Sequence, residues 1–206
     1  MISCVPRLIL ASASPARLAT LRRAGLNPEV IVSEVAEENV YGSTPGSTAE
    51  LLAVLKAEAV ARRVPHPVPG TVVLGCDSLL ELDGDALGKP GTAEAAIERW
   101  QAMRGRSGVL HTGHCLIEPA TGMRAVATAS TTVQFAQVSD AEIEAYVATG
   151  EPLRVAGAFT IDGRGGAFVE KIEGDHHNVV GVSLPLLRRM CKALGVTWTD
   201  LWELPV

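Results

Sequence analysis

Hydrophobic residues recur at two different spacings along this chain, and the alternation predicts an α/β protein. Apolar runs at residues 7–11, 28–33 (PEVIVS) and 71–76 (TVVLGC) have the length and β-branched content of strands. Between these runs, residues 15–24 and 48–63 carry apolar side chains at helical spacing. Strands and helices interleave without repeats, low complexity or a linker. The pattern therefore predicts a single domain over residues 1–206, built on a mixed sheet.

The second half of the chain continues the same pattern. Asp83-Gly84 is a hairpin signal, and three residues are N-cap candidates for helices: Thr92, Ser139 and Ser183. Strands are predicted from alternation at residues 108–118, 123–136, 156–162 (AGAFTID) and 167–173 (AFVEKIE). The GRGG sequence between the last two strands is predicted to be a hairpin turn.

Composition narrows the class of protein. At 206 residues and 47% hydrophobic content, the chain can bury a sizeable core without covalent staples. No apolar run approaches the roughly 18 residues of a membrane helix, and the start MISCVPR does not resemble a secretory signal, so we expect a cytoplasmic protein without a membrane partner. The cysteines lack C-x-x-C spacing, which favours reduced core thiols: Cys4, Cys76, Cys115 and Cys191.

Charge excludes one class of partner and constrains another. A net charge of −5 and a pI near 5.6 argue against bulk nucleic-acid binding, which needs a spread basic surface. An acidic protein that binds an anionic ligand must gather its cations locally. Arg17, Lys56 and Lys89 are the candidates for such a cluster.

The segment VLGCDSLLELDGDALGKP carries the first chemical signal. It places Asp77 at the end of an apolar run and, one hairpin later, Lys89 between Gly88 and Pro90. A carboxylate at a strand's end can hold a metal or accept a proton from water, and a lysine on an unencumbered backbone can contact a phosphate. The pair predicts chemistry on a phosphorylated small molecule. Cys76 is interpreted as a packing residue rather than a nucleophile, because no base lies near it in sequence.

The segment RLILASASPARLATLRRAG carries the second signal. It predicts a short strand, a Ser12-Ala13-Ser14 loop, and a helix opened by Pro15. With Ser14 as N-cap, free backbone N–H groups, two hydroxyls and the positive end of the helix dipole meet at one point, with Arg17 one turn along. This arrangement predicts an anion site.

The histidines are weaker candidates. His111 and His114 are spaced like a metal pair, but residues three apart on a strand face opposite sides, so their rings should not converge on one ion. His176 and His177 are adjacent in a predicted loop, and contact with substrate or with solvent both stay open. The spacing of Gly84 to Lys89 does not match a Walker A loop.

Seven motifs in the same order resemble those of the Maf-type nucleoside triphosphate pyrophosphatases. They comprise SASPAR, Glu37 in a loop, Lys56 on a helix, GCDS, LGKP, GHCLI, and the stretch from YVATGEPL to NVVG. The resemblance covers nearly the whole chain. It implies an α/β fold with a mixed, elongated central sheet flanked by helices, and two lobes with an active-site cleft, as in the Maf and inosine triphosphate pyrophosphatases.

The resemblance also implies an activity and its residues. Members cleave a nucleoside triphosphate to the monophosphate and pyrophosphate, which clears non-standard nucleotides or restrains division, and a homodimer is implied. Matching motifs give Asp77 the proton-acceptor role and assign a divalent cation, Mg²⁺ or Mn²⁺, to Glu37 and Asp77. Lys89 joins them as a catalytic residue. The implied substrate-binding residues are Ser12, Ser14, Arg17, Lys56, Ser78 and Asp162.

Departures from the family pattern bear on the substrate and on turnover. Ala16 stands where many members have an arginine, and Asp162 stands where members acting on dTTP and UTP have glutamine. A carboxylate at that place can accept two hydrogen bonds from guanine, which favours a purine such as 7-methyl-GTP. The alternative is a nucleotide-binding division regulator without turnover, supported by the loss of lysine at Val155. The presence of Glu37, Asp77 and Lys89 together favours an enzyme. A third alternative, a phosphatase or nucleotidyltransferase acting on a different substrate, would use the same residues, and pyrophosphate release would distinguish it from a pyrophosphatase.

Overall fold

The structure is a computed structural model that describes residues 6–203. Its centre is one mixed seven-stranded sheet in the order β2-β1-β3-β5-β6-β7, with β4 paired to β3. β1 runs parallel to β2 and to β3, and the other strand pairs are antiparallel. The strands are β1 Arg7–Leu10, β2 Glu29–Val30, β3 Thr71–Leu82, β4 Asp85–Leu87, β5 Ser107–Ile117, β6 Arg124–Phe135 and β7 Val169–Glu173. The predicted mixed sheet is confirmed.

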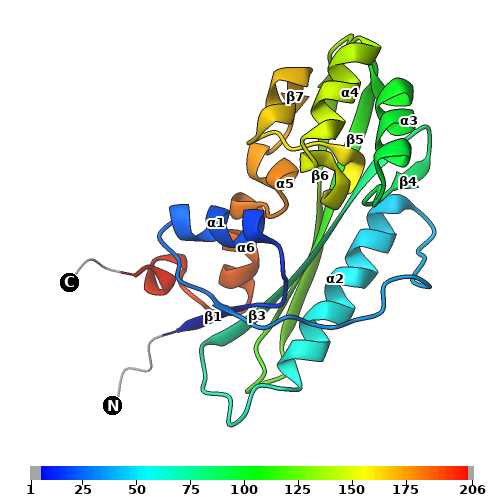
Figure 1. The fold of residues 1–206 in the computed structure, drawn as a ribbon. Helices are drawn as coiled ribbons and strands as arrows, with labels where there is room; N and C mark the ends of the chain where they lie inside the picture. The colour runs from blue at the N-terminus through cyan, green and yellow to red at the C-terminus, as the bar shows by residue number, and fades with distance from the viewer. Residues whose placement is uncertain (1–5, 204–206) are drawn as a thin grey trace.

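Six α-helices accompany the sheet in the described residues (Figure 1). They are α1 Pro15–Arg23, α2 Pro45–Ala61, α3 Ala93–Met103, α4 Asp140–Ala148, α5 His176–Val180 and α6 Leu184–Ala193. The predicted N-caps are confirmed, because each capping side chain accepts a hydrogen bond from a backbone N–H of its own helix: Ser14, Thr92, Ser139 and Ser183. No described helix is both long enough and apolar enough to cross a membrane.

Alternation along β3 sorts the helices onto the two faces of the sheet. Its even-numbered apolar residues belong to two separate core clusters, one packed with α1 and α6 and the other with α3 and α4. The odd-numbered residues face α2, which lies alone along the opposite face. The two clusters at successive positions along the sheet correspond to the two predicted lobes, and Figure 1 shows them as separate groups of helices.

Two predicted strands differ from the structure. The strand expected over residues 28–33 is reduced to Glu29–Val30, since the chain leaves β1 after one further hydrogen bond from Ile31 N to Leu10 O. The strand expected over residues 156–162 is wrong. Gly157 and Ala158 have φ of 70° and 60°, which breaks an extended chain, and Trp100 Nε1 donates to the Ala158 carbonyl.

Local signals also misplaced two loops. GRGG does not form a hairpin turn but begins a 3₁₀ segment, Arg164–Phe168, because the Gly165 N–H donates to the carboxylate of Glu151 at 3.1 Å. The segment with His176 and His177 is not a loop but helix α5, capped by Asp175, whose Oδ1 accepts from His177 N at 3.0 Å.

Two glycines let α2 approach the sheet unusually closely. A Cβ on Gly75 of β3 would lie 2.2 Å from Ala53 O, and one on Gly113 of β5 would lie 2.3 Å from Ala49 O. Gly113 is paired in register with Asp77. The helix backbone therefore rests on two adjacent strands, where only glycine leaves room.

We expect Gly75→Ala to destabilise the fold, because the added methyl group must push the α2 backbone away. Overpacking of this kind costs at least about 2 kcal/mol, which urea unfolding would measure. Gly88→Ala is the matched control, since its Cβ would meet only Leu79 Cδ2 at an ordinary 3.7 Å. Equal stability of the two variants would contradict the close packing of α2.

His114 is buried between β5 and the start of α6. Its Nε2 accepts from the Ser183 N–H at 2.9 Å and its Nδ1 donates to the Thr112 carbonyl at 2.9 Å. Burial, which is the largest of several effects, lowers the pKa of His114 to about 4. The folded protein therefore holds this imidazole in its neutral form.

This burial predicts acid sensitivity. The stability contributed by neutral His114 is fully present above the unfolded pKa of about 6.5 and is lost as pH falls towards about 4, because the unfolded chain then binds a proton that the folded chain does not. The loss is on the order of 3 kcal/mol. His114→Gln should flatten the pH dependence of the urea midpoint between pH 7 and 4, whereas His66→Asn, at an exposed site, should leave it unchanged. Equal slopes in all three proteins would refute this.

Candidate functional site

Asp77 lies in the middle of β3, at a gap in the sheet edge. β1 pairs with residues 71–74 of β3 and β4 pairs with residues 80–82, so residues 75–79 have no partner on that side among the strands of residues 6–203. The prediction that Asp77 ends its strand is wrong, because the strand continues through the less apolar residues that follow. Asp77 lies beside an unpaired stretch of the sheet edge because the pairing of β1 with β3 ends at Leu74.

The ammonium of Lys56 joins two carboxylates at this gap. Lys56 projects from α2 and is only 6% exposed. Its Nζ lies 2.5 Å from Asp77 Oδ1 and 2.8 Å from Glu37 Oε1. Glu37 comes from the loop before α2, and Asp77 from the face of β3 that α2 covers. Two carboxylates from distant parts of the sequence thus contact the same nitrogen atom, Lys56 Nζ.

The electrostatics of Glu37 place further cations near this group. Burial raises the pKa of Glu37, but the hydrogen bond and charge of Lys56, followed by the charges of Lys89 and Arg17, outweigh it and bring the pKa below its usual value. Glu37 is therefore held ionised among three positive side chains. The local gathering of cations expected for an acidic protein is present here.

Arg17 is held at the start of α1 by protein acceptors. The Oγ of Ser12 accepts from Arg17 Nη1 at 3.1 Å and from the Ser14 N–H at 3.2 Å. The same guanidinium donates from Nε to Gly181 O at 2.7 Å and from Nη2 to Ser78 Oγ at 3.0 Å. Ser78 faces away from α2, so Asp77 and Ser78 present the two faces of one strand at the gap.

Lys89 is exposed in a loop whose backbone is fixed from a distant segment. The Gly88 carbonyl accepts from the Gly157 N–H at 3.2 Å, and the Gly91 N–H donates to Leu153 O at 3.1 Å. Lys89 itself has the freedom of an exposed lysine while its backbone is anchored on both sides.

Asp162 is not part of the charged cluster. It lines a separate cavity of about 140 Å³ between α1, α5 and α6. The other lining residues are Thr20, Arg23, Ala24, His176, His177, Val180 and Leu184. Sequence reasoning missed Glu151, whose Oε1 holds the loop carrying Asp162 by accepting from Tyr146 Oη at 3.1 Å, from the Gly165 N–H and from the Thr160 hydroxyl.

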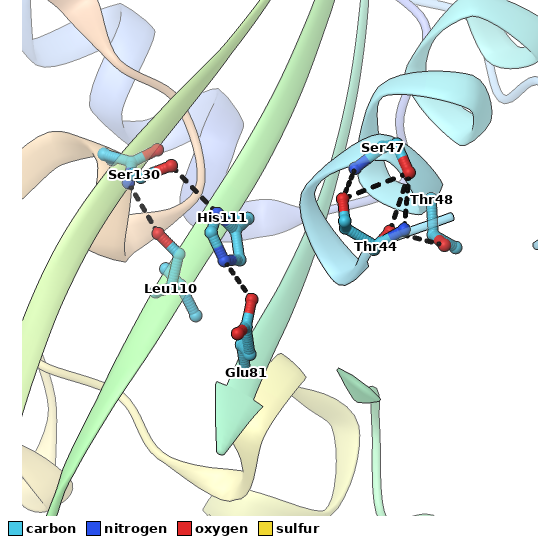
Figure 2. A network of polar contacts seen from close by, with 8 residues as sticks. Thr44, Ser47, Thr48, Glu81, Leu110, His111 and Ser130 are labelled. Atoms are coloured by element: carbon cyan, nitrogen blue, oxygen red, sulfur yellow. Dashed lines mark hydrogen bonds and ion pairs between the residues drawn. The ribbon is translucent and has the colours of Figure 1, made fainter. Parts of the chain in front are cut away.

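The two histidines of the HTGH sequence point to opposite sides of β5. Figure 2 shows His111 turned towards Glu81 and Ser130. Its ring nitrogens lie 2.9 Å from Glu81 Oε2 and 2.8 Å from Ser130 Oγ. His114 is buried on the other face of β5, where its Nε2 accepts from the Ser183 N–H, so the expected divergence of the two rings is confirmed. No group of three or more His, Cys, Asp or Glu suited to a metal occurs within residues 6–203. Glu37 and Asp77 thus stand as a pair of carboxylates.

The thiols are buried, as expected for core residues. Cys76, Cys115 and Cys191 are free and buried, while Cys4 lies outside the described residues. Burial raises the pKa of Cys76 to about 12, because its effect is larger than the opposite effect of the Arg17 and Lys56 charges. A thiol in this state is a poor nucleophile, which agrees with its interpretation as a packing residue.

Comparison with known proteins shows the family of this chain. The family model described as "Maf-like protein" matches residues 7–194. A Streptomyces coelicolor protein named nucleoside triphosphate pyrophosphatase is 58% identical over 196 residues, covering 95% of this chain and 94% of the relative. Proteins of the same name from Salinispora tropica and Thermosynechococcus vestitus are 59% and 52% identical; they cover 96% and 94% of this chain, and 88% and 96% of the relatives. This chain belongs to the Maf family.

Proposed function

We propose that this protein is a nucleoside triphosphate pyrophosphatase, which hydrolyses a nucleoside triphosphate to the monophosphate and pyrophosphate. The names of its relatives support the reaction. The observation that carries it in the structure is the buried ammonium of Lys56 between Asp77 and Glu37, with Arg17 and Lys89 near enough to act on the pKa of Glu37. Such a site combines a carboxylate for water with several cations for phosphate oxygens.

The donor set also fits a divalent cation. Mg²⁺ is typically bound by one or two carboxylates together with substrate phosphates and water, rather than by a complete protein cage. Glu37 and Asp77 supply two carboxylates that already approach one common cation, and they would hold Mg²⁺ or Mn²⁺. When bound, that ion would neutralise phosphate charge and lower the pKa of a coordinated water.

The side chains of the site have different roles in the proposed reaction. Asp77 is the proton acceptor that activates or orients the attacking water. Lys56 fixes the direction of the Asp77 carboxylate through their 2.5 Å ion pair and faces the phosphates as a cation. Ser12, Ser14, Arg17 and Lys89 bind the phosphates. The exposed Lys89 meets the charge that grows on the leaving pyrophosphate.

Asp162 is proposed to read the base. Its cavity begins one turn along α1 from Arg17, at Thr20, and reaches Val180, the neighbour of the Gly181 that holds Arg17. A nucleotide with its phosphates at Arg17 would lie along this path. Since a carboxylate can accept both the N1–H and the N2 amine of guanine, the proposal favours a guanine-type base over uracil or thymine.

Asp77→Asn should lower kcat by at least about a hundredfold, because the substitution keeps the shape of the side chain and removes the base. Chelation with EDTA should likewise abolish turnover, and added Mg²⁺ or Mn²⁺ should restore it. The assay is a panel of GTP, 7-methyl-GTP, UTP and dTTP, scored for pyrophosphate against orthophosphate. Asp83→Asn, an exposed acid in the turn after β3, is the matched control. Full activity of Asp77→Asn would refute the mechanism, and orthophosphate as product would refute the reaction.

Asp162→Gln should change base preference without abolishing turnover. Leaving a guanine donor unpaired costs about 1–3 kcal/mol, so kcat/KM for GTP and 7-methyl-GTP should fall relative to UTP and dTTP. Glu170→Gln, at an exposed position on β7, controls for the change in net charge. If the four kcat/KM values keep their ratios in Asp162→Gln, the residue does not read the base.

A further inference from the structure

A directed chain of hydrogen bonds runs from Arg17 into the core. Ser78 Oγ accepts from Arg17 Nη2 at 3.0 Å and lies 2.9 Å from Thr112 Oγ1. Thr112 Oγ1 in turn lies 3.1 Å from the Asn178 carbonyl oxygen. Ser78 and Thr112 are cross-strand partners on β3 and β5. Thr112 and Asn178 are fully buried, and Arg17 is 8% exposed.

The chemistry of the two ends fixes the direction of this chain. A guanidinium only donates and a carbonyl only accepts. Thr112 must therefore give its single hydroxyl hydrogen to Asn178 O, which leaves Thr112 Oγ1 as an acceptor. Ser78 can only donate to it, and so turns a lone pair towards Arg17. Consecutive hydrogen bonds of the same sense strengthen one another.

The far end of the chain is firmly anchored. The side chain of Asn178 donates from Nδ2 to Leu110 O at 3.1 Å and to Thr131 Oγ1 at 3.0 Å. Three residues on, Gly181 O accepts from Arg17 Nε at 2.7 Å. Helix α5 and its C-cap residue Gly181 thus hold the guanidinium twice, directly through Gly181 and indirectly from Asn178 through Thr112 and Ser78.

The two serines beside Arg17 consequently differ in what they offer a substrate. The hydrogen of Ser78 is committed to Thr112. Ser12 Oγ, by contrast, accepts from Arg17 and from the Ser14 N–H, so its own hydrogen remains available as a donor. A guanidinium has five N–H groups, and three are bound within residues 6–203, which leaves two for an anion.

We propose that Thr112 is a positioning residue of the hydrolase: by fixing the hydroxyl of Ser78 as an acceptor, it aims the free N–H groups of Arg17 at the substrate phosphates. Ser78 acts through Arg17 and does not itself donate to the nucleotide. The proposal rests on the proposed function, in which Arg17 binds phosphate.

The test is a double-mutant cycle between Thr112 and Arg17, measured as kcat and KM for GTP and for UTP with Mg²⁺. Thr112→Val, which is nearly isosteric, should lower kcat/KM by about three- to tenfold, the worth of one hydrogen bond. Thr112→Ser keeps the hydroxyl and should restore activity to within about twofold. In an Arg17→Ala background, Thr112→Val should cost no more than about twofold.

Matched measurements separate positioning from folding. Thr128→Val on β6 removes a hydroxyl bonded to Glu50 and should leave kcat/KM unchanged. Urea midpoints of all variants show whether stability accounts for any loss. An equal cost of Thr112→Val with and without Arg17, or no cost at all, overturns the inference. If Arg17→Ala itself leaves kcat/KM unchanged, the phosphate role of Arg17 in the proposed function fails, and the inference fails with it.

Discussion

The buried ammonium of Lys56 is the constraint on which the site and much of the fold depend. A charge that is only 6% exposed is tolerated when it is paired, and removing one partner would leave a costly uncompensated charge. Asp77 on β3 and Glu37 on the loop before α2 supply the pairing. The backbone of α2, which carries Lys56, lies directly on the sheet beside Asp77. The glycines at 75 and 113 make that approach sterically allowed.

The gap between β1 and β4 explains how an acidic protein concentrates positive charge. On the stretch of β3 without an edge partner, alternation turns Asp77 towards α2 and Ser78 towards α1. Lys56 therefore arrives from one face of the sheet and Arg17 from the other. Cations that would repel one another on a single helix are brought together around one open edge where, despite its burial, their charges lower the pKa of Glu37.

Sequence reasoning succeeded where the determinants are local. The helix caps at Ser14 and Ser139, the hairpin at Asp83 and the long β5–β6 pair all follow from residues within a few positions of each other. It failed where a distant partner decides. The Ala158 carbonyl accepts a hydrogen bond from Trp100 where the expected strand is broken. The Gly165 N–H donates to the Glu151 carboxylate where a hairpin turn was expected. Neither partner can be identified from spacing.

The candidate site divides in the same way. Ser12, Ser14, Arg17 and Lys89 are visible as local motifs, whereas the pairing of Glu37 with Asp77 was implied only by family resemblance. That both carboxylates contact Lys56 was not predicted. The role proposed for Thr112 could not be predicted from the sequence around it, HTGH, in which only the spacing of the histidines suggests a site. A buried hydroxyl has no sequence signal of its own, because threonine on a strand is ordinary. Its importance appears only when its bonding partners are known.

The placement of Asp162 outside the charged cluster has a structural reason. Helix α1 and the C-terminal end of α5 contribute to both regions: Arg17 contacts Gly181, the C-cap of α5, while Thr20 and Val180 line the cavity that Asp162 also lines. In the proposed function, the same two helices therefore set the distance between the phosphates and the base. A change that shifts α5 relative to α1 should then alter phosphate binding and base preference together.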